Sequence, residues 1–375
     1  MIRHAAANAA AAETTTSDAG PSAGLRARVI ILCLLFGLVE GYDLQNLSLA
    51  IPTLAADWMK PAPAFGAALA ASTAGILLGS ISVGPLGDRW PRQAIVAWSC
   101  AAFALFSLVS ATSPNMLILF LCRLGIGFAA GVCTPSAYAL VADHTPPRLA
   151  TRCLTAMTCM ISPGALGGGL VAPALLAAWS WPGLFAAGGL ASALLAIAVA
   201  FGLRELVPRH AVRQREAPTG SASPRLRELF LMPVAGLWAP ALRMQTLYLW
   251  LLWSFNSFTF YALANWLPTV LASNGFALDT ALRLASLTWG GGIAGGLLLA
   301  WSFDRLNCRR LVTASALLAG ALLLLALNWT PPTVRDWGVL LAGIGMAIGG
   351  MQSMIPAIAA RLYPPAILAT GLSWG

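Results

Sequence analysis

Charged side chains are scarce: only 9% of the 375 residues are Asp, Glu, Lys or Arg, whereas soluble proteins carry about 25%. This scarcity excludes a protein whose whole exterior faces water. Lysine occurs once, as Lys60, and no Gly-x-x-x-x-Gly-Lys phosphate-binding loop is present, so ATP is not the expected energy source. The three histidines are not clustered, and the seven cysteines lack the paired spacing of a metal site. We therefore expect no metal and no cofactor, and a membrane enzyme is the least favoured class.

Apolar residues, by contrast, make up 58% of the chain, and the mean hydropathy is +0.77. The alternating segments of a transmembrane β-barrel are absent. At about 20 residues per spanning helix, the length predicts an all-α integral membrane protein of roughly ten to twelve helices. The net charge of +9 does not indicate a nucleic-acid partner, because the basic residues lie between apolar spans, where they set membrane topology.

Apolar spans divide the chain into two groups separated by a polar linker. Residues 1–27 are polar and rich in Ala, Thr and Ser, and we predict a disordered cytoplasmic tail. The longest polar stretch, 204–245, is a cytoplasmic central linker between an N-terminal six-helix bundle (28–203) and a truncated C-terminal bundle (246–375). Ten spans are predicted, at about 28–54, 65–86, 94–111, 116–142, 154–178, 183–203, 246–271, 282–303, 311–329 and 338–360. An eleventh span begins at Ile367, and we expect it to be a stub.

The basic residues fix the predicted orientation. With the N-terminus in the cytoplasm, nearly all arginines between spans lie inside, and the outer segments hold only Lys60, Arg283 and Arg335. This asymmetry follows the positive-inside rule. The expected location is the bacterial inner membrane.

A weak internal repeat relates the two groups of spans. GPLGDRWPRQ (84–93) follows the second span, and AWSFDRLNCRR (300–310) follows the eighth. Glycines precede both segments in step, Gly75 and Gly79 in the first and Gly291 and Gly295 in the second. The repeat suggests a duplicated six-helix unit.

Several of these segments resemble one family of transporters. GPLGDRWPRQ is similar to the loop signature of the major facilitator superfamily, which is built from two six-helix bundles. EGYDLQNLSLAIPTLAADW (40–58) is similar to the first helix of the aromatic acid:proton symporter family, with Glu40 in place of the family's first Asp. RLGIGFAAGVCTPSAYALVADHTPPRLATRC (123–153) resembles the fourth helix and its loop, and YALANWLPTVL (261–271) resembles the seventh helix.

The resemblance implies a secondary transporter driven by the proton gradient. It would import a hydroxybenzoate-like or phenylpropanoate-like anion with a proton by alternating access. A drug or metabolite proton antiporter is the first alternative, although SPGALGGG (162–169) lacks the Gly-Pro-x-x-Gly-Gly spacing of that branch. A truncated, non-transporting remnant is the second, because the sequence ends inside the eleventh span and Leu368 stands where the family usually has Arg.

Three charged residues fall well inside predicted spans, away from the span ends, where charge is costly and therefore points to function. Glu40 and Asp43 are three residues apart on one helix face. At about 1.5 Å per residue, Asp43 and Arg123 lie roughly 13 Å and 12 Å below the outer ends of their spans. Two interpretations stay open. Asp43 and Arg123 form a structural ion pair, or Arg123 binds a substrate carboxylate while Asp43 or Glu40 carries the coupled proton.

A second set of charged residues lies at the cytoplasmic boundary of the membrane. Asp88, Arg89 and Arg92 follow the second span. Positive-inside anchoring and a helix cap account for Arg92, whereas the superfamily resemblance assigns Asp88 a gating role. Asp304 and Arg305 are the pseudo-symmetric counterparts. We predict that these five residues gate the cytoplasmic side.

Uncharged polar side chains within the spans are candidates for lining the substrate site. Asn46 continues the stripe of Glu40 and Asp43. The second group of spans offers hydrogen bonds to a ring hydroxyl from Asn256, Tyr261, Asn265 and Gln352.

Overall fold

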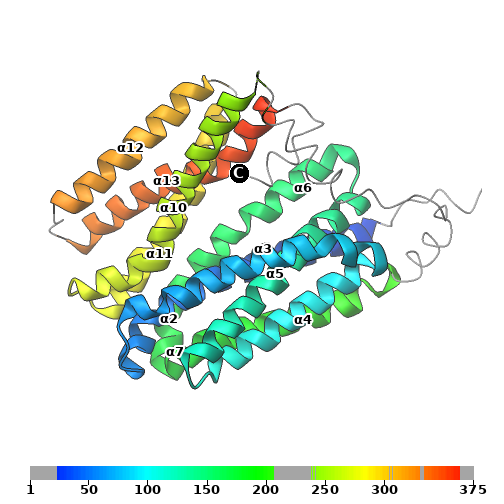
Figure 1. The fold of residues 1–375 in the computed structure, drawn as a ribbon, viewed down its shortest axis with the longest axis horizontal. Coiled ribbons are helices and arrows are strands. Elements are labelled where there is room, and N and C mark those ends of the chain that lie inside the picture. Colours follow the sequence, from blue (N-terminus) through cyan, green and yellow to red (C-terminus); the bar gives the residue numbers. More distant parts are fainter. Residues whose placement is uncertain are drawn as a thin grey trace, which may run out of the picture.

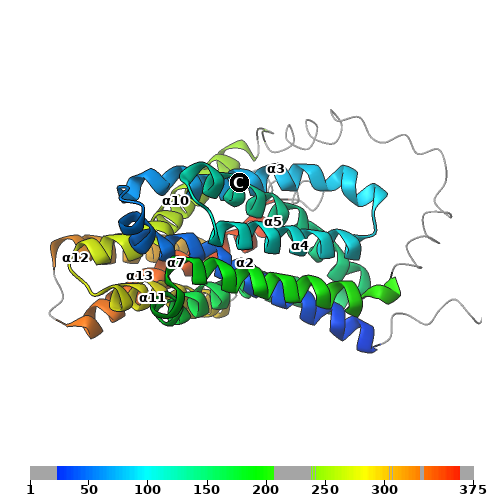
Figure 2. The same cartoon turned by 90° about the horizontal axis from the view of Figure 1, so that it is seen from below.

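The computed structural model of the protein describes residues 23–206, 238, 240, 242–303, 305, 307–329 and 333–363. Throughout these residues the regular structure is helical, with no strand, and the predicted all-α fold is confirmed. The N-terminal half contains α2 (Ala23–Asp57), η1 (Ala62–Phe65), α3 (Gly66–Arg89), α4 (Arg92–Ala111), α5 (Met116–His144), α6 (Pro147–Cys159), α7 (Ile161–Gly202) and η2 (Arg204–Leu206). The C-terminal half contains α10 (Arg243–Ser273), α11 (Leu278–Phe303), α12 (Cys308–Asn328) and α13 (Val334–Leu362). The two halves lie side by side in both views (Figures 1 and 2).

The ten complete predicted spans coincide with helices, with two corrections at their ends, and the eleventh, from Ile367, lies outside the described residues. Helix α2 begins at Ala23, ahead of the span expected from residue 28. Residues 154–159, which we assigned to the fifth span, belong instead to α6. That helix has the sequence PRLATRCLTAMTC, in which polar residues alternate with apolar ones at helical spacing, so it is amphipathic and too polar to cross a bilayer.

Helix α7 contains the fifth and sixth spans joined by a sharp reversal. Ser180 has non-helical backbone angles, with φ 55° and ψ −161°. Pro182 follows and has no N–H to donate to the preceding turn. The Tyr42 ring packs over Gly168, before the reversal, and over Gly188, after it. The two spans are therefore antiparallel neighbours, as two separate membrane crossings require.

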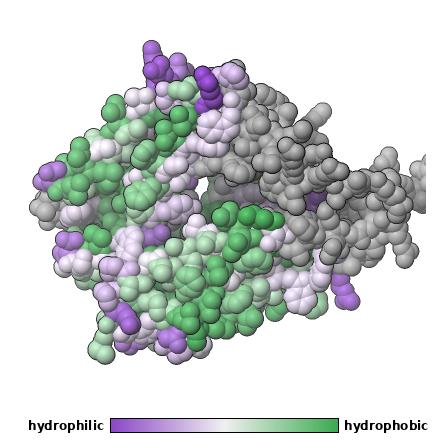
Figure 3. Space-filling model, viewed as in Figure 1, coloured by the Kyte–Doolittle hydropathy of each residue, from purple (hydrophilic) through white to green (hydrophobic). Residues whose placement is uncertain are grey.

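The exterior of the helices is apolar. Seven helical segments in the described residues are long and apolar enough to cross a membrane by length and composition, and large side chains on the outside are exposed, including Leu194 (68%), Phe258 (75%) and Leu327 (82%). Figure 3 shows such apolar surface over both halves. An exterior of this kind is stable only in lipid, so the protein is a multi-pass membrane protein.

Glycines bring two pairs of helices into backbone contact at equivalent places in the halves. In the N-terminal half, Gly75 and Gly79 of α3 face the backbone of α5. In the C-terminal half, Gly291 and Gly295 of α11 face the backbone of α13 in the same way. The glycines of the sequence repeat therefore have the same packing role in both halves, and small residues permit this close approach.

Substituting one of these glycines is expected to destabilise the protein. A Cβ on Gly295 would lie 2.0 Å from the Met346 carbonyl oxygen, so Gly295→Ala forces α11 and α13 apart at a cost of about 1–3 kcal/mol. Gly320→Ala is the matched control, because nothing lies within 4 Å of a Cβ there. We expect a lower melting temperature in detergent for the first variant alone. Equal melting temperatures would contradict this packing.

Candidate functional site

A cavity of about 340 Å³ lies between the two halves, a volume typical of small-molecule sites. Figure 3 shows the surface hollowed along this boundary. The charged residues in the described lining all come from the N-terminal half: Glu40, Asp43 and Arg123. The C-terminal half contributes the rings of Trp253, Phe260, Tyr261 and Trp289 and the amides of Asn265 and Gln352. One wall is thus charged and the other aromatic.

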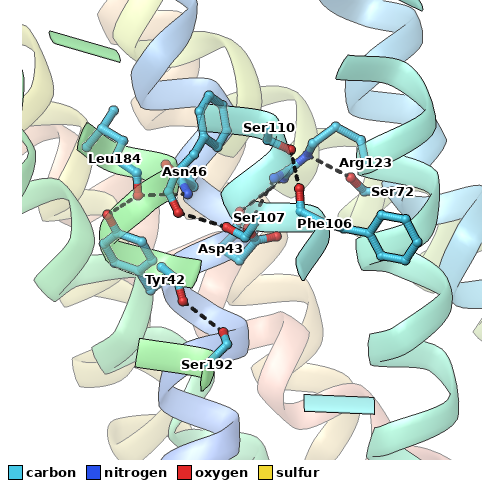
Figure 4. A network of polar contacts seen from close by, with 12 residues as sticks. Tyr42, Asp43, Asn46, Ser72, Phe106, Ser107, Ser110, Arg123, Leu184 and Ser192 are labelled. Carbon is cyan, nitrogen blue, oxygen red and sulfur yellow. Dashed lines mark hydrogen bonds and ion pairs between the residues drawn. The ribbon is translucent and has the colours of Figure 1, made fainter. Parts of the chain in front are cut away.

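Asp43 and Arg123 form a buried ion pair between α2 and α5. Arg123 Nη1 donates to Asp43 Oδ1 at 3.1 Å, and Nη2 donates to the Asp43 backbone carbonyl at 3.1 Å. The side chains are only 6% and 3% exposed. Figure 4 shows the guanidinium of Arg123 between Asp43 and Ser72, whose hydroxyl accepts from Nε at 3.2 Å. Three elements, α2, α3 and α5, therefore hold the guanidinium at the cavity wall.

Arg123 retains unused hydrogen-bonding capacity. A guanidinium has five N–H donors, and three are directed at Asp43 and Ser72. The remaining two have no acceptor among the described residues. They lie one on each Nη, at the two outer edges of the guanidinium, so each can donate to a separate acceptor.

Glu40 lies one turn before Asp43 and faces the same cavity. Its Oε1 accepts from the Thr134 hydroxyl of α5 at 3.2 Å. The structure therefore brings together the three charged residues that the sequence places inside the membrane.

Asn46 does not line the cavity, which corrects our expectation for this residue. Its side chain is fully buried, and Nδ2 donates to the Leu184 carbonyl of α7 at 3.2 Å. Tyr42 donates to the same carbonyl at 2.8 Å, and Figure 4 shows both on that side of α2. Three residues advance a helix by 300°, so Asn46 is rotated about 120° from Glu40 and faces α7.

The remaining polar candidates divide into two groups. Tyr261, Asn265 and Gln352 line the cavity. Asn256 is absent from its lining and lies behind Gln352, to whose Oε1 it donates at 2.7 Å. The structure thus makes Asn256 a support for a lining residue.

The predicted gating residues are only partly described. The backbone of Asp88 and Arg89 ends α3, but their side chains and the whole of Asp304 lie outside the described residues. Arg92 pairs with Asp143 of α5 at 2.5 Å. The Arg305 guanidinium lies 4.0 Å above the Trp301 ring. Gating by these residues stays a prediction.

The two halves are joined by a buried polar contact that sequence reasoning missed. Gln45 Nε2 and the Ser48 hydroxyl of α2 both donate to the Ala264 carbonyl of α10, at 3.0 and 2.9 Å. Pro268, four residues later, has no N–H with which to satisfy that carbonyl inside the helix. Trp289 of α11 completes the contact by donating to Gln45 Oε1 at 3.2 Å. Pro268 in YALANWLPTVL (261–271) was the sequence signal for this contact, because a proline leaves the carbonyl four residues earlier without its helical donor.

This contact closes one end of the cavity. Gln45 and Ser48 follow Asp43 toward the end of α2 at Asp57. On the same side, Leu282 of α11 packs into a core cluster of the N-terminal half that includes Leu47. The halves are therefore packed together beyond Asp43 in the direction of Asp57.

Comparison with known proteins matches the chain to one protein family and to individual transporters. Residues 33–375 match the family described as the Major Facilitator Superfamily. The chain is 32% identical to the 4-hydroxybenzoate transporter PcaK of Pseudomonas aeruginosa, over 95% of this chain and 84% of that protein. It is 33% identical to the 3-(3-hydroxy-phenyl)propionate transporter of Escherichia coli, over 91% of this chain and 80% of that protein.

Solved structures of transporters share the fold. A bacterial homolog of the human lysosomal transporter Spinster, in an inward-facing and unoccupied conformation, matches with a TM-score of 0.74 at 19% identity, over 94% of this chain and 79% of that one. A D-xylose-proton symporter matches with a TM-score of 0.70 at 16% identity, over 92% and 85%. At these identities the likeness concerns the fold alone.

Proposed function

The chain belongs to the major facilitator superfamily, and on that premise we propose that it imports an aromatic carboxylate together with a proton by alternating access. Membership makes it a transporter and not an enzyme. The substrate class we propose is a hydroxybenzoate-like or phenylpropanoate-like anion, in keeping with the names of the relatives. The observation that carries the proposal is the buried Asp43–Arg123 pair on a cavity whose opposite wall is aromatic.

Arg123 is the proposed carboxylate ligand. Its guanidinium can form a two-pronged contact with a carboxylate once a proton on Asp43 releases Nη1 and Nη2, and such charge-assisted contacts are stronger than neutral hydrogen bonds. The rings of the opposite wall give the aromatic part of the substrate an apolar surface to pack against. The cavity thus offers complementary surfaces to the two parts of an aromatic acid.

The proton follows from the charge balance of the site. We take Glu40 as protonated, and Asp43 and Arg123 together are neutral, so an entering monoanion leaves one uncompensated negative charge in a buried place, which is costly. One proton on Asp43 removes that charge and frees Arg123 for the substrate. We therefore propose one proton per monoanion, carried by Asp43, with Glu40 as the alternative carrier.

Alternating access supplies the movement in this proposal. Substrate enters from outside when the Gln45–Ala264 contact opens, and it leaves when the halves rock to open the cytoplasmic end. We place the protein in the bacterial inner membrane with its N-terminus in the cytoplasm, because the arginines between spans then lie inside. The cytoplasmic closure would use Asp88, Arg89, Arg92, Asp304 and Arg305.

Uptake by intact cells tests the proposal. Cells producing the chain are expected to accumulate labelled 4-hydroxybenzoate above cells carrying an empty vector. A protonophore, which collapses the proton gradient, is expected to reduce that accumulation to equilibration. Accumulation that survives the protonophore would contradict proton coupling, and uptake equal to the empty vector would contradict the substrate class.

A further inference from the structure

We infer that Gln352 recognises an oxygen substituent on the substrate ring, through an amide N–H that Asn256 directs into the cavity. The inference rests on the proposed function and deepens it by assigning the specificity of the C-terminal wall. It concerns Gln352 of α13 and two residues of α10, Asn256 and Ser257.

The orientation of the Asn256 amide is fixed by a backbone group. Its Nδ2 lies 3.3 Å from the Ile348 carbonyl oxygen, which only accepts hydrogen bonds. The same nitrogen lies 2.7 Å from the Gln352 side chain. Asn256 therefore presents a donor to Gln352, and the Gln352 atom that accepts this hydrogen bond is its carbonyl oxygen, Oε1.

This requirement determines which end of Gln352 remains free. With Oε1 held by Asn256, Nε2 is the other end of the amide, and one of its hydrogens is donated to the Ser257 hydroxyl at 3.1 Å. An amide nitrogen has two hydrogens, and the second has no acceptor among the described residues. Since Gln352 lines the cavity, this hydrogen is a donor held ready for a ligand.

The position of Gln352 selects the part of the ligand that it meets. The charged lining residues belong to the opposite half, so the substrate carboxylate is drawn toward Arg123. Gln352 lies on the wall of Trp253 and Phe260, where the ring packs. The donor therefore faces a ring substituent remote from the carboxylate.

A hydrogen-bond donor at this place favours ligands that carry an acceptor there. A ring hydroxyl or carbonyl oxygen fits, whereas an unsubstituted ring leaves the amide hydrogen unpaired after the cavity loses water. The structure thus points to hydroxylated or otherwise oxygenated aromatic acids, in preference to benzoate itself.

The test compares two substrates on the same protein, so that a general loss of transport activity lowers both values and cancels in their ratio. Uptake of 4-hydroxybenzoate and of benzoate is measured on purified protein in liposomes, and Vmax/KM is compared for the two acids. Wild type is expected to favour 4-hydroxybenzoate. Gln352→Met keeps the length of the side chain and removes its polar atoms, and we expect the ratio to fall about 2- to 10-fold, the effect of one hydrogen bond between uncharged groups.

Two further variants separate positioning from packing. Asn256→Leu leaves Gln352 in place without its orienting donor, and we expect a smaller fall of the ratio in the same direction. Thr259→Ala is the matched control, since its hydroxyl donates to Phe255 of its own helix at 2.9 Å, and the ratio is expected to stay at the wild-type value.

The outcomes distinguish this inference from the function on which it rests. A wild-type protein that transports both acids without preference, or a Gln352→Met protein with an unchanged ratio, overturns the role of Gln352 and leaves the proposed function standing. A wild-type protein that transports neither acid overturns the proposed function itself.

Discussion

Asp43→Asn is expected to abolish proton-driven accumulation while leaving substrate exchange intact. Under one proton per monoanion, a gradient of one pH unit sustains about tenfold accumulation by wild type, and the variant should only equilibrate its substrate. Asparagine has nearly the shape of aspartate and still offers Arg123 Nη1 an acceptor, but it binds no proton and has no charge. Accumulation and counterflow in liposomes measure the two activities separately.

The charge balance of the site also predicts the direction of the affinity change. Without the Asp43 carboxylate, Arg123 is an uncompensated buried cation, so a substrate anion is expected to bind Asp43→Asn as tightly as wild type or more tightly. Asp57→Asn is the matched control, because Asp57 lies at the far end of α2 and accepts from Trp181 at 3.0 Å. Accumulation retained by Asp43→Asn and lost by Glu40→Gln would show that Glu40 carries the proton.

Arg123→Lys is expected to lower the apparent affinity for aromatic acids about 10- to 100-fold, the loss of one or two hydrogen bonds between charged groups. The lysine keeps the positive charge, and Asp43 keeps a counter-ion. A single ammonium cannot reach Ser72, the carboxylate and backbone carbonyl of Asp43, and a substrate carboxylate together, because it lacks the planar fork of the guanidinium. The measurement is KM for 4-hydroxybenzoate uptake.

Arg28→Lys is the control for this substitution. Arg28 pairs with Glu205 at 3.2 Å, with side chains 46% and 61% exposed, and an exposed pair contributes at most about 1 kcal/mol. Its uptake should equal that of wild type. An unchanged KM in Arg123→Lys would assign Arg123 to the structural ion pair alone.

The meeting of Asp43 and Arg123 was predictable from the sequence for a physical reason. Charges in lipid require partners, and the fixed rise of a helix sets the depth of each residue along its span. The same regularity holds for the spans themselves, whose apolar lengths mark the helices. The exact position of the reversal, at Ser180, was not predicted, because it depends on the backbone angles of a single residue.

The direction in which a side chain points around its helix axis was harder to predict than the depth of that residue in the membrane. The prediction for Asn46 failed because each step of three residues rotates the side chain further from Glu40, until it faces α7. Asn256 and Gln352 were grouped as equivalent lining residues, yet one supports the other across α10 and α13. Contacts of this kind depend on which helices become neighbours, and the partners of Gln45 in the opposite half were missed for that reason.

The most direct test of the central claim is lumenal pH during substrate entry into liposomes containing the purified protein. After subtraction of protein-free liposomes, which report passive permeation, external 4-hydroxybenzoate is expected to acidify the lumen by one proton for each substrate molecule that enters. Acidification should disappear in Asp43→Asn while substrate exchange persists. Entry of 4-hydroxybenzoate through the wild-type protein without lumenal acidification would contradict the account.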